Sequence, residues 1–317
     1  MKPIGGFFEL ELPRGGGSPH PGAVALCTGR ACLTVLLQHL KPKLVHVPYH
    51  TCDASLEPFR RSNVGTRFYA LDEDLHPVSL PDLASGEYFL WIDYYGVCGA
   101  ITERLKTHYS DRLIIDDTHA FYRGGHAGHW SFTSARKYFG VPDGAFLFAP
   151  VPVAIDAARF AAVSLDHGLL RLLGRQAEAY RAYTSYERSL TGDVQRISAI
   201  SEGLLRGVDH EAVKSARRRN FRYFHEQLGA SNTFRYRFDP ADVPFCYPYL
   251  PAVPIDRPAM YEKGLFAPQL WPDELERGIE GYAWEKRLST ELLPLPVDHR
   301  YTVDDLRRFV EHLQNPR

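Results

Sequence analysis

The sequence lacks any long apolar run, and it carries almost no net charge. None of its apolar stretches approaches the roughly 20 residues that a membrane-spanning helix needs, and the first residues lack the apolar core of a signal peptide. A formal net charge of −1 over 317 residues gives no overall field for nucleic acid or an anionic membrane. We therefore expect a cytoplasmic protein that binds neither.

Cysteine is also scarce. The five cysteines are scattered and form no Cys-x-x-Cys pair, so neither a disulfide framework nor a structural zinc site is indicated. What the chain does have is 44% hydrophobic residues, which is enough to bury a large apolar core at this length. One large and one small domain are the expected division.

Short apolar runs alternate with helical patterns along the first half of the chain. The patterns predict helices at residues 30–40, 54–61 and 101–109, and strands at residues 23–27, 44–47, 67–70, 88–92, 113–115 and 146–148. This alternation favours an α/β fold with a mostly parallel sheet covered by helices. We expect an N-terminal arm (1–22), a large domain (23–205) and a smaller C-terminal α+β domain (206–317).

The second half of the chain is mainly helical in pattern. We predict helices within residues 156–201, one long helix over residues 209–228 and a last helix over residues 302–313, which opens with a capping-box pattern at Thr302 and Asp305. Two short strands are predicted, at residues 234–238 and 245–250.

The most informative segment surrounds Lys137. An apolar β-branched run ends in Asp116 and Asp117, followed by His119, as expected where a buried strand delivers side chains to a site at its carboxyl end. Ser134 and Lys137 then place a hydroxyl and an amine three residues apart. A reactive amine, a carboxylate for the pyridine nitrogen and donors for the phosphate are what pyridoxal phosphate requires of a protein.

A phosphate loop is predicted near the N-terminus. Thr28, Gly29, Arg30 and Ala31 follow a predicted strand and open a predicted helix, where unpaired backbone N–H groups favour an anion. An ordinary strand-to-helix turn would show the same pattern.

Six motifs occur in order along the chain: Thr28-Gly29-Arg30-Ala31-Cys32-Leu33, Val47-Pro48-Tyr49-His50-Thr51-Cys52, Asp93-Tyr94-Tyr95-Gly96, Asp116-x-x-His119, Arg217-Arg218-Arg219-Asn220 and Leu293-Pro294-Leu295-Pro296-Val297-Asp298-His299-Arg300-Tyr301. Together they resemble the DegT/DnrJ/EryC1/StrS family of sugar aminotransferases, a branch of the fold-type I pyridoxal phosphate enzymes. The resemblance covers nearly the whole chain. It implies the fold-type I architecture, pyridoxal 5'-phosphate as cofactor and a homodimer.

The resemblance also implies a role for each site residue. Lys137 would hold the cofactor and move protons, Asp116 would contact its pyridine nitrogen, and His119 would contact its hydroxyl side. The remaining cofactor contacts would come from Thr28, Gly29, Arg30, Ala31, Cys52 and Ser134. The candidates for substrate contact, and for stacking on the ring, are Tyr49, His50, Tyr94 and Tyr95.

The sequence departs from the family pattern at three places. Cys52 stands where the family commonly has an aromatic residue or a histidine, and Phe132 stands where it usually has a serine. An asparagine that reaches the phosphate from the partner subunit has no clear counterpart, and residues 183–188 are the best candidates for that role.

The expected activity is transfer of an amino group from an amino acid, with glutamate as the leading donor, to a keto sugar. The sugar is expected to be nucleotide-linked and to enter surface polysaccharide or secondary-metabolite biosynthesis. The sequence leaves open the sugar or cyclitol, the carbon that is aminated, the nucleotide and the donor.

Other classes of function were weighed against this one. Asp116, His119, His126 and His129 include the residue types of a zinc or iron site, as in a metal-dependent hydrolase. A catalytically inactive scaffold on the same fold is a further alternative. The basic run at residues 217–219 is more typical of a solvated helix face than of a nucleic-acid site, and we expect no metal.

Overall fold

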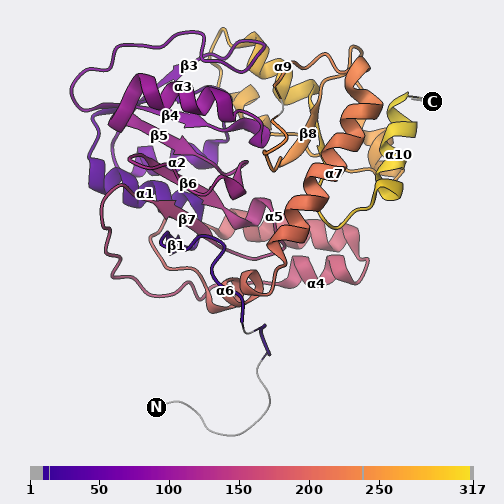
Figure 1. Cartoon of the computed structure of the whole chain (residues 1–317), viewed down its shortest axis with the longest axis horizontal. Helices are drawn as coiled ribbons and strands as arrows, with labels where there is room; N and C mark the ends of the chain where they lie inside the picture. Colours follow the sequence, from indigo (N-terminus) through magenta and orange to yellow (C-terminus); the bar gives the residue numbers. More distant parts are fainter. Residues whose placement is uncertain (1–9, 14, 238, 315–317) are drawn as a thin grey trace, which may run out of the picture.

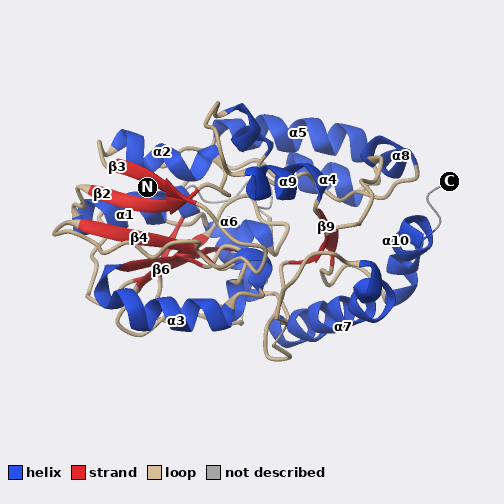
Figure 2. Cartoon of the chain, turned by 90° about the horizontal axis from the view of Figure 1, so that it is seen from above, coloured by secondary structure: helices blue, strands red, loops and turns tan. Residues whose placement is uncertain are grey.

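The computed structural model describes residues 10–13, 15–237 and 239–314 of the chain. A seven-stranded sheet forms one end of the molecule (Figures 1 and 2), in the order β1-β7-β6-β5-β4-β2-β3. The strands are β1 (Val24–Leu26), β2 (Leu44–Pro48), β3 (Gly65–Tyr69), β4 (Glu87–Ile92), β5 (Leu113–Asp116), β6 (Trp130–Ser134) and β7 (Ala145–Phe148). The two pairs that include β7 are antiparallel and the other four pairs are parallel, so the sheet is mostly parallel, as predicted.

Helices cover both faces of this sheet. On one face, α1 (Gly29–Leu40) and α2 (Asp53–Arg61) share a core with Leu90 and Ile114. On the other face, α3 (Gly99–Tyr109) shares a core with Trp91 and Ile115. Because neighbouring strand residues point to opposite faces, a strand buried on both sides must be apolar throughout. This explains the uninterrupted apolar runs in the sequence.

The middle of the chain is helical only in part. It contains α4 (Asp166–Leu172), α5 (Gln176–Ser189), α6 (Ala199–Arg206) and α7 (His210–Leu228). The long helix predicted at residues 209–228 is confirmed, with the Asp209 side chain capping the N–H of Ala212 at 2.9 Å. The prediction of helix was wrong for residues 156–165. Their backbone pairs instead with the segment around Arg196, which bonds to Ala158 and Phe160.

The C-terminal part is built around a second, two-stranded antiparallel sheet, β8 (Cys246–Tyr249) and β9 (Leu293–Pro296). It also holds α8 (Arg257–Glu262), α9 (Ala283–Glu291) and α10 (Val303–Gln314), and lies beside α7 at the end of the molecule opposite the large sheet (Figure 2). The capping box is confirmed, because the Thr302 N–H donates to the Asp305 carboxylate at 2.8 Å. Short 3₁₀ helices link the elements: η1 (Tyr94–Gly96), η2 (Ser110–Arg112), η3 (Phe121–Arg123), η4 (Ala135–Lys137), η5 (Gly229–Ser231) and η6 (Pro272–Glu276).

Two strands, β6 and β9, were not predicted, and one predicted strand was wrong. The strand β6 was not predicted, because its alternation of aromatic residues with serine and threonine follows a Gly/His-rich loop. Residues 234–237, predicted as a strand, lie in an irregular segment that pairs with no strand of the described chain, and Phe238 lies outside the described residues.

The predicted N-terminal arm lies partly outside the described residues, which omit positions 1–9 and 14. The described part of the arm is irregular, and Leu12 and Pro13 lie against Gly203 and Gly207 of α6. In the part of the chain that the structure describes, no helix combines the length and the apolar character needed to cross a bilayer.

Candidate active site

The candidate site lies at the carboxyl edge of the parallel strands. Asp116 is the last residue of β5, Ser134 is the last residue of β6, and Lys137 ends the 3₁₀ turn that follows β6. Because β5 and β6 are parallel neighbours, with Asp116 opposite Phe132, their ends meet at one edge of the sheet. This is where open α/β sheets bind their ligands.

Asp116 is buried, at 6% exposure, and its carboxylate accepts a hydrogen bond from the Thr118 N–H at 2.9 Å. Burial raises the pKa of Asp116 from 3.8 to about 6, while the hydrogen bonds from Thr118 and the charge of Lys137 act in the opposite direction. Asp116 and Lys137 are therefore close enough to interact electrostatically. A buried carboxyl group held near a cation is suited to a protonated nitrogen of a ligand.

Asp117 points to the opposite side of the strand. Its carboxylate lies 2.9 Å from His126 Nε2, its N–H donates to the Phe132 carbonyl, and Thr133 donates to its carbonyl. Two adjacent aspartates at one strand end thus have separate surroundings, as the alternation of strand side chains requires.

Lys137 is exposed. Hydrogen bonds from residues 135 and 143–144 hold the turn in which it lies. The Ala135 N–H donates to the Gly144 carbonyl at 3.0 Å. The buried carboxylate of Asp143 accepts hydrogen bonds from the N–H and hydroxyl of Ser198, at 2.7 and 2.6 Å. Lys137 opens onto a cavity of about 710 Å³ between the two parts of the chain, which also includes Arg136, Arg171, Tyr183, Cys246, Phe266, Arg300 and Arg308 in its lining.

The start of α1 offers donors for an anion. The Thr28 hydroxyl is already used, because it accepts from the Ala31 N–H at 3.0 Å and donates to the Thr191 carbonyl. The N–H groups of Gly29 and Arg30 have no acceptor among the described residues. The Ser134 hydroxyl also has no hydrogen-bond partner among them. The Arg30 guanidinium itself pairs with Glu57 at 3.2 Å.

The aromatic candidates lie deep inside the protein. Tyr49, His50, Tyr94 and Tyr95 are each fully buried, and they bond to one another and to the segment at residues 271–277. The Tyr94 hydroxyl donates to the His50 carbonyl at 2.8 Å, and the Tyr95 hydroxyl lies 3.1 Å from His50 Nε2. Cys52, by contrast, is partly exposed at the start of α2.

His119 is also buried, and two aromatic rings stack on its imidazole ring. Its Nδ1 accepts from the Tyr95 N–H at 3.3 Å, and burial lowers the pKa of the imidazole well below its usual value. The ring stacks with Phe245, at 4.4 Å between centroids, and with Trp271, at 5.5 Å. Both partners come from the C-terminal part of the chain.

Sequence reasoning missed the segment at residues 271–277, which covers the end of β2. The Glu274 carboxyl lies 3.1 Å from His50 Nδ1, and the Glu274 carbonyl accepts from the Tyr49 hydroxyl at 2.7 Å. Arg277 pairs with Asp53 at 2.8 Å. The one signal in the sequence was Pro272 followed by acidic residues, which is typical of a helix start.

Glu274 and His50 form a buried neutral pair. Burial raises the pKa of Glu274 from 4.5 to about 9, and burial lowers the pKa of His50 from 6.5 to about 3. Both pKa shifts favour the uncharged form of the group. A neutral carboxyl hydrogen-bonded to a neutral imidazole leaves no buried charge. Glu274 then donates to His50, and His50 can donate onward to the Tyr95 hydroxyl.

The candidate metal ligands are not brought together. No group of three or more His, Cys, Asp or Glu side chains is placed to hold a metal among the described residues. His126 is occupied by Asp117, and His129 bonds to the Ala127 carbonyl at 2.9 Å. The structure does not favour the metal-dependent alternative.

The segment at residues 183–188 lies on α5, beside the Lys137 turn. Glu187 pairs with Arg136, and Tyr183 lies on the wall of the cavity at Lys137.

Several solved structures with a similar fold are sugar aminotransferases. A DegT/DnrJ/EryC1/StrS aminotransferase from Brucella abortus superposes with a TM-score of 0.61 at 15% identity, over 92% of this chain and 85% of the other. DesI, in the presence of its TDP-sugar product, gives 0.62 at 17% identity over 95% and 82%. DesV from S. venezuelae, in complex with a ketimine intermediate, gives 0.63 at 16% identity over 92% and 84%. No family model and no curated protein sequence matches the chain.

The chain therefore has the fold-type I architecture that the sequence predicted. Within that fold, the residues present fit pyridoxal phosphate. A buried carboxyl at Asp116, an accessible amine at Lys137, and unpaired donors at Gly29, Arg30 and Ser134 lie at one sheet edge. They match the pyridine nitrogen, aldehyde and phosphate of the cofactor in chemistry.

The Glu274 pKa predicts how stability changes with pH. Because the folded-state pKa of about 9 exceeds the ordinary value of 4.5, the folded chain binds this proton more tightly. Its contribution to the free energy of unfolding is complete below about pH 4.5 and is lost as pH rises toward 9. Above about pH 6.5 the lowered pKa of His50 no longer gives an opposing slope. Urea unfolding between about pH 6.5 and pH 8.5 should therefore show a loss of up to roughly 1.4 kcal/mol per pH unit from Glu274.

The Glu274→Gln variant should remove that slope, because glutamine stays neutral throughout. The exposed neighbour provides the control, since Glu276→Gln should keep the slope of the unchanged protein. Equal slopes in all three proteins would show that Glu274 is ionised in the folded chain.

Proposed function

We propose that this protein is a pyridoxal phosphate-dependent aminotransferase that transfers an amino group from an amino acid to a keto sugar. The observation that carries the proposal is the meeting of Asp116 and Lys137 at the ends of neighbouring parallel strands, on a fold shared with sugar aminotransferases. Glutamate is the donor that we expect, and surface polysaccharide or secondary-metabolite biosynthesis is the expected setting.

When bound, pyridoxal phosphate would supply an aldehyde that bonds to amines and a ring that accepts electrons. Lys137 Nζ would hold the cofactor and, once the donor amine has replaced it, take the proton from the donor's α-carbon. The Asp116 carboxylate would keep a proton on the pyridine nitrogen. Gly29, Arg30 and Ser134 would donate hydrogen bonds to the phosphate.

The cavity beside Lys137 supports a nucleotide-linked acceptor. Its volume of about 710 Å³ lies within the range of small-molecule sites, and arginines from α4 and the C-terminal part face it. Guanidinium groups bind phosphates well, which a sugar carried on a diphosphate would offer. One solved structure of the same fold, DesI, was determined in the presence of its TDP-sugar product.

We further propose that the protein is a homodimer in which a second copy covers the hairpin of α4 and α5. This hairpin exposes Leu169, Leu172, Leu173 and Tyr180 at 54%, 83%, 71% and 66%. It lies next to the Lys137 turn through the contact of Glu187 with Arg136. A symmetric dimer is the commonest assembly of soluble proteins and would bury these apolar side chains.

The first test is covalent labelling of Lys137. Protein loaded with pyridoxal phosphate should be yellow, and borohydride should bleach the colour and leave a phosphopyridoxyl group on the peptide that contains Lys137. Lys137→Arg keeps the charge but should abolish the label, while the control Lys106→Arg on the exposed side of α3 should keep it. A colourless protein that takes up no cofactor would overturn the proposal.

The second test separates the two aspartates. Asp116→Asn removes the charge that would protonate the pyridine nitrogen, so cofactor should still bind while the half-reaction with an amino donor slows roughly a hundredfold or more. Asp117→Asn should instead weaken the contact with His126 and lower stability by about 1–3 kcal/mol, with the half-reaction kept. A fast Asp116→Asn protein beside an inactive Asp117→Asn protein would show that the roles are reversed.

The third test concerns assembly. Light scattering should show a dimer, and the double change Leu172→Lys and Leu173→Lys should shift it toward the monomer, because it places two charges in an apolar contact. Val78→Lys is the matched control, since Val78 is a 64% exposed apolar residue elsewhere on the surface. A stable monomer before any change would refute the proposed dimer.

A further inference from the structure

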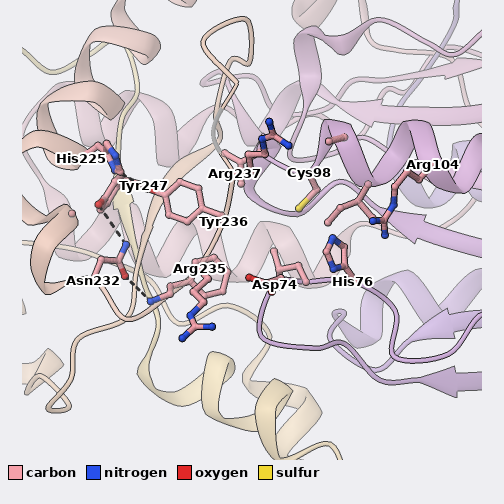
Figure 3. A pocket seen from close by; sticks show the side chains of 16 residues that line it. Asp74, His76, Cys98, Arg104, His225, Asn232, Arg235, Tyr236, Arg237 and Tyr247 are labelled. Atoms are coloured by element: carbon pink, nitrogen blue, oxygen red, sulfur yellow. Dashed lines mark hydrogen bonds between the residues drawn. The ribbon is translucent and has the colours of Figure 1, made fainter.

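A second cavity lies away from Lys137, between the large sheet and the C-terminal part of the chain. Its volume is about 550 Å³, and its walls come from the loop that follows β3, the first turns of α3, and the segment at residues 229–237. Figure 3 shows Asp74, His76, Cys98 and Arg104 on one side and His225, Asn232, Arg235, Tyr236, Arg237 and Tyr247 on the other.

The two cavities lie on opposite faces of β8. Cys246 lines the cavity at Lys137, whereas its neighbour Tyr247 lines the second cavity. Since adjacent strand residues point to opposite faces, the two-stranded sheet separates the two spaces. A ligand in the second cavity would therefore not touch the groups proposed to hold the cofactor.

The second cavity carries an excess of positive charge. Arg104 of α3, together with Arg235 and Arg237 of the irregular segment, lines it, and no hydrogen-bond or ion-pair partner is found for any of these three guanidinium groups within the described residues. Asp74 is the only carboxylate among the residues that line this space. Ala100, in the first turn of α3, adds the partial positive charge of a helix start.

Arg104, Arg235 and Arg237 are exposed, but they line a hollow rather than one face of a single helix. Arg104 comes from a segment more than a hundred positions away in the sequence from Arg235 and Arg237, and all three line one concave space. The ring of Tyr236 lies on the side of Tyr247 and His225 (Figure 3). Leu75, Ile101 and Phe234 supply apolar wall. Guanidinium groups that lack partners inside a hollow are suited to phosphate, and the apolar wall is suited to a ring.

We propose that this cavity is a second ligand site, which binds a nucleoside diphosphate or its ester. The arginines would bind the diphosphate, and the apolar wall beside Tyr236 would bind the base. The Asp74 carboxylate repels phosphate but can accept a hydrogen bond from a ribose hydroxyl, which favours a nucleotide over a bare diphosphate. Because its walls come from both parts of the chain, bound ligand would hold these parts in one arrangement.

Titration calorimetry of the full chain at fixed ionic strength tests the proposal, with the common nucleoside diphosphates and inorganic pyrophosphate as probes. At least one nucleoside diphosphate should bind more tightly than pyrophosphate. Arg104→Gln and the double change Arg235→Gln and Arg237→Gln should each weaken it by about tenfold or more, the effect expected for losing a charged hydrogen bond. Arg222→Gln, an exposed arginine on the outer side of α7, should leave the affinity unchanged.

Hydrogen exchange locates the ligand. Protection should appear in peptides covering residues 97–101 and 229–237, and it should persist in the Lys137→Arg protein, which separates this site from the one proposed for catalysis. Borohydride labelling of Lys137 should in turn be unaffected by the arginine changes. No nucleoside diphosphate binding, equal binding of pyrophosphate, or unchanged affinity in the arginine variants would overturn the proposal.

Discussion

The position of Lys137 depends on one buried cation. The Arg217 guanidinium, at 1% exposure, donates to the carbonyls of Tyr138, Pro244 and Phe245 at 3.1–3.3 Å and lies 4.0 Å above the Tyr138 ring. Burial lowers its pKa, and the nearby Tyr138 opposes that effect. A buried guanidinium group has lost its water, so its charge is stabilised only if carbonyl oxygens and an aromatic ring face surround it. Arg217 thus fastens α7 and the start of β8 to the residue that follows Lys137.

The same helix fixes the end of the second sheet. Asn220, one turn beyond Arg217, donates to the carbonyls of Val297, Asp298 and Tyr301 at 3.0–3.3 Å. The buried Asn220 amide therefore helps to hold the loop after β9 against α7, and the cavity at Lys137 takes part of its wall from this loop. Residues 217–220 therefore join the two parts of the chain around the candidate site. The expectation of a solvated helix face at residues 217–219 was wrong for Arg217, which is buried.

The sequence predicted local features and missed those that depend on distant partners. Asp116, Ser134 and Lys137 were proposed from a strand end, a turn and the order of the family motifs, and the structure places them at one edge of the sheet. Residues 234–237 have the aromatic alternation of a strand but no strand to pair with, which no local pattern reveals. Residues 271–277 were missed for a related reason. Glu274 meets His50 across 224 positions, and acidic residues that follow a proline are usually solvent-exposed.

The alternation along β8 makes the two cavities mechanically dependent on each other. Cys246 and Tyr247 are adjacent, and the Phe245 N–H donates to the Tyr95 carbonyl at 2.8 Å while the Phe245 ring stacks on His119. A shift of this strand would change both the second cavity and the surroundings of His119. Because packed interiors change between discrete arrangements rather than deforming continuously, any ligand that fixes β8 from one side also selects the arrangement available on the other.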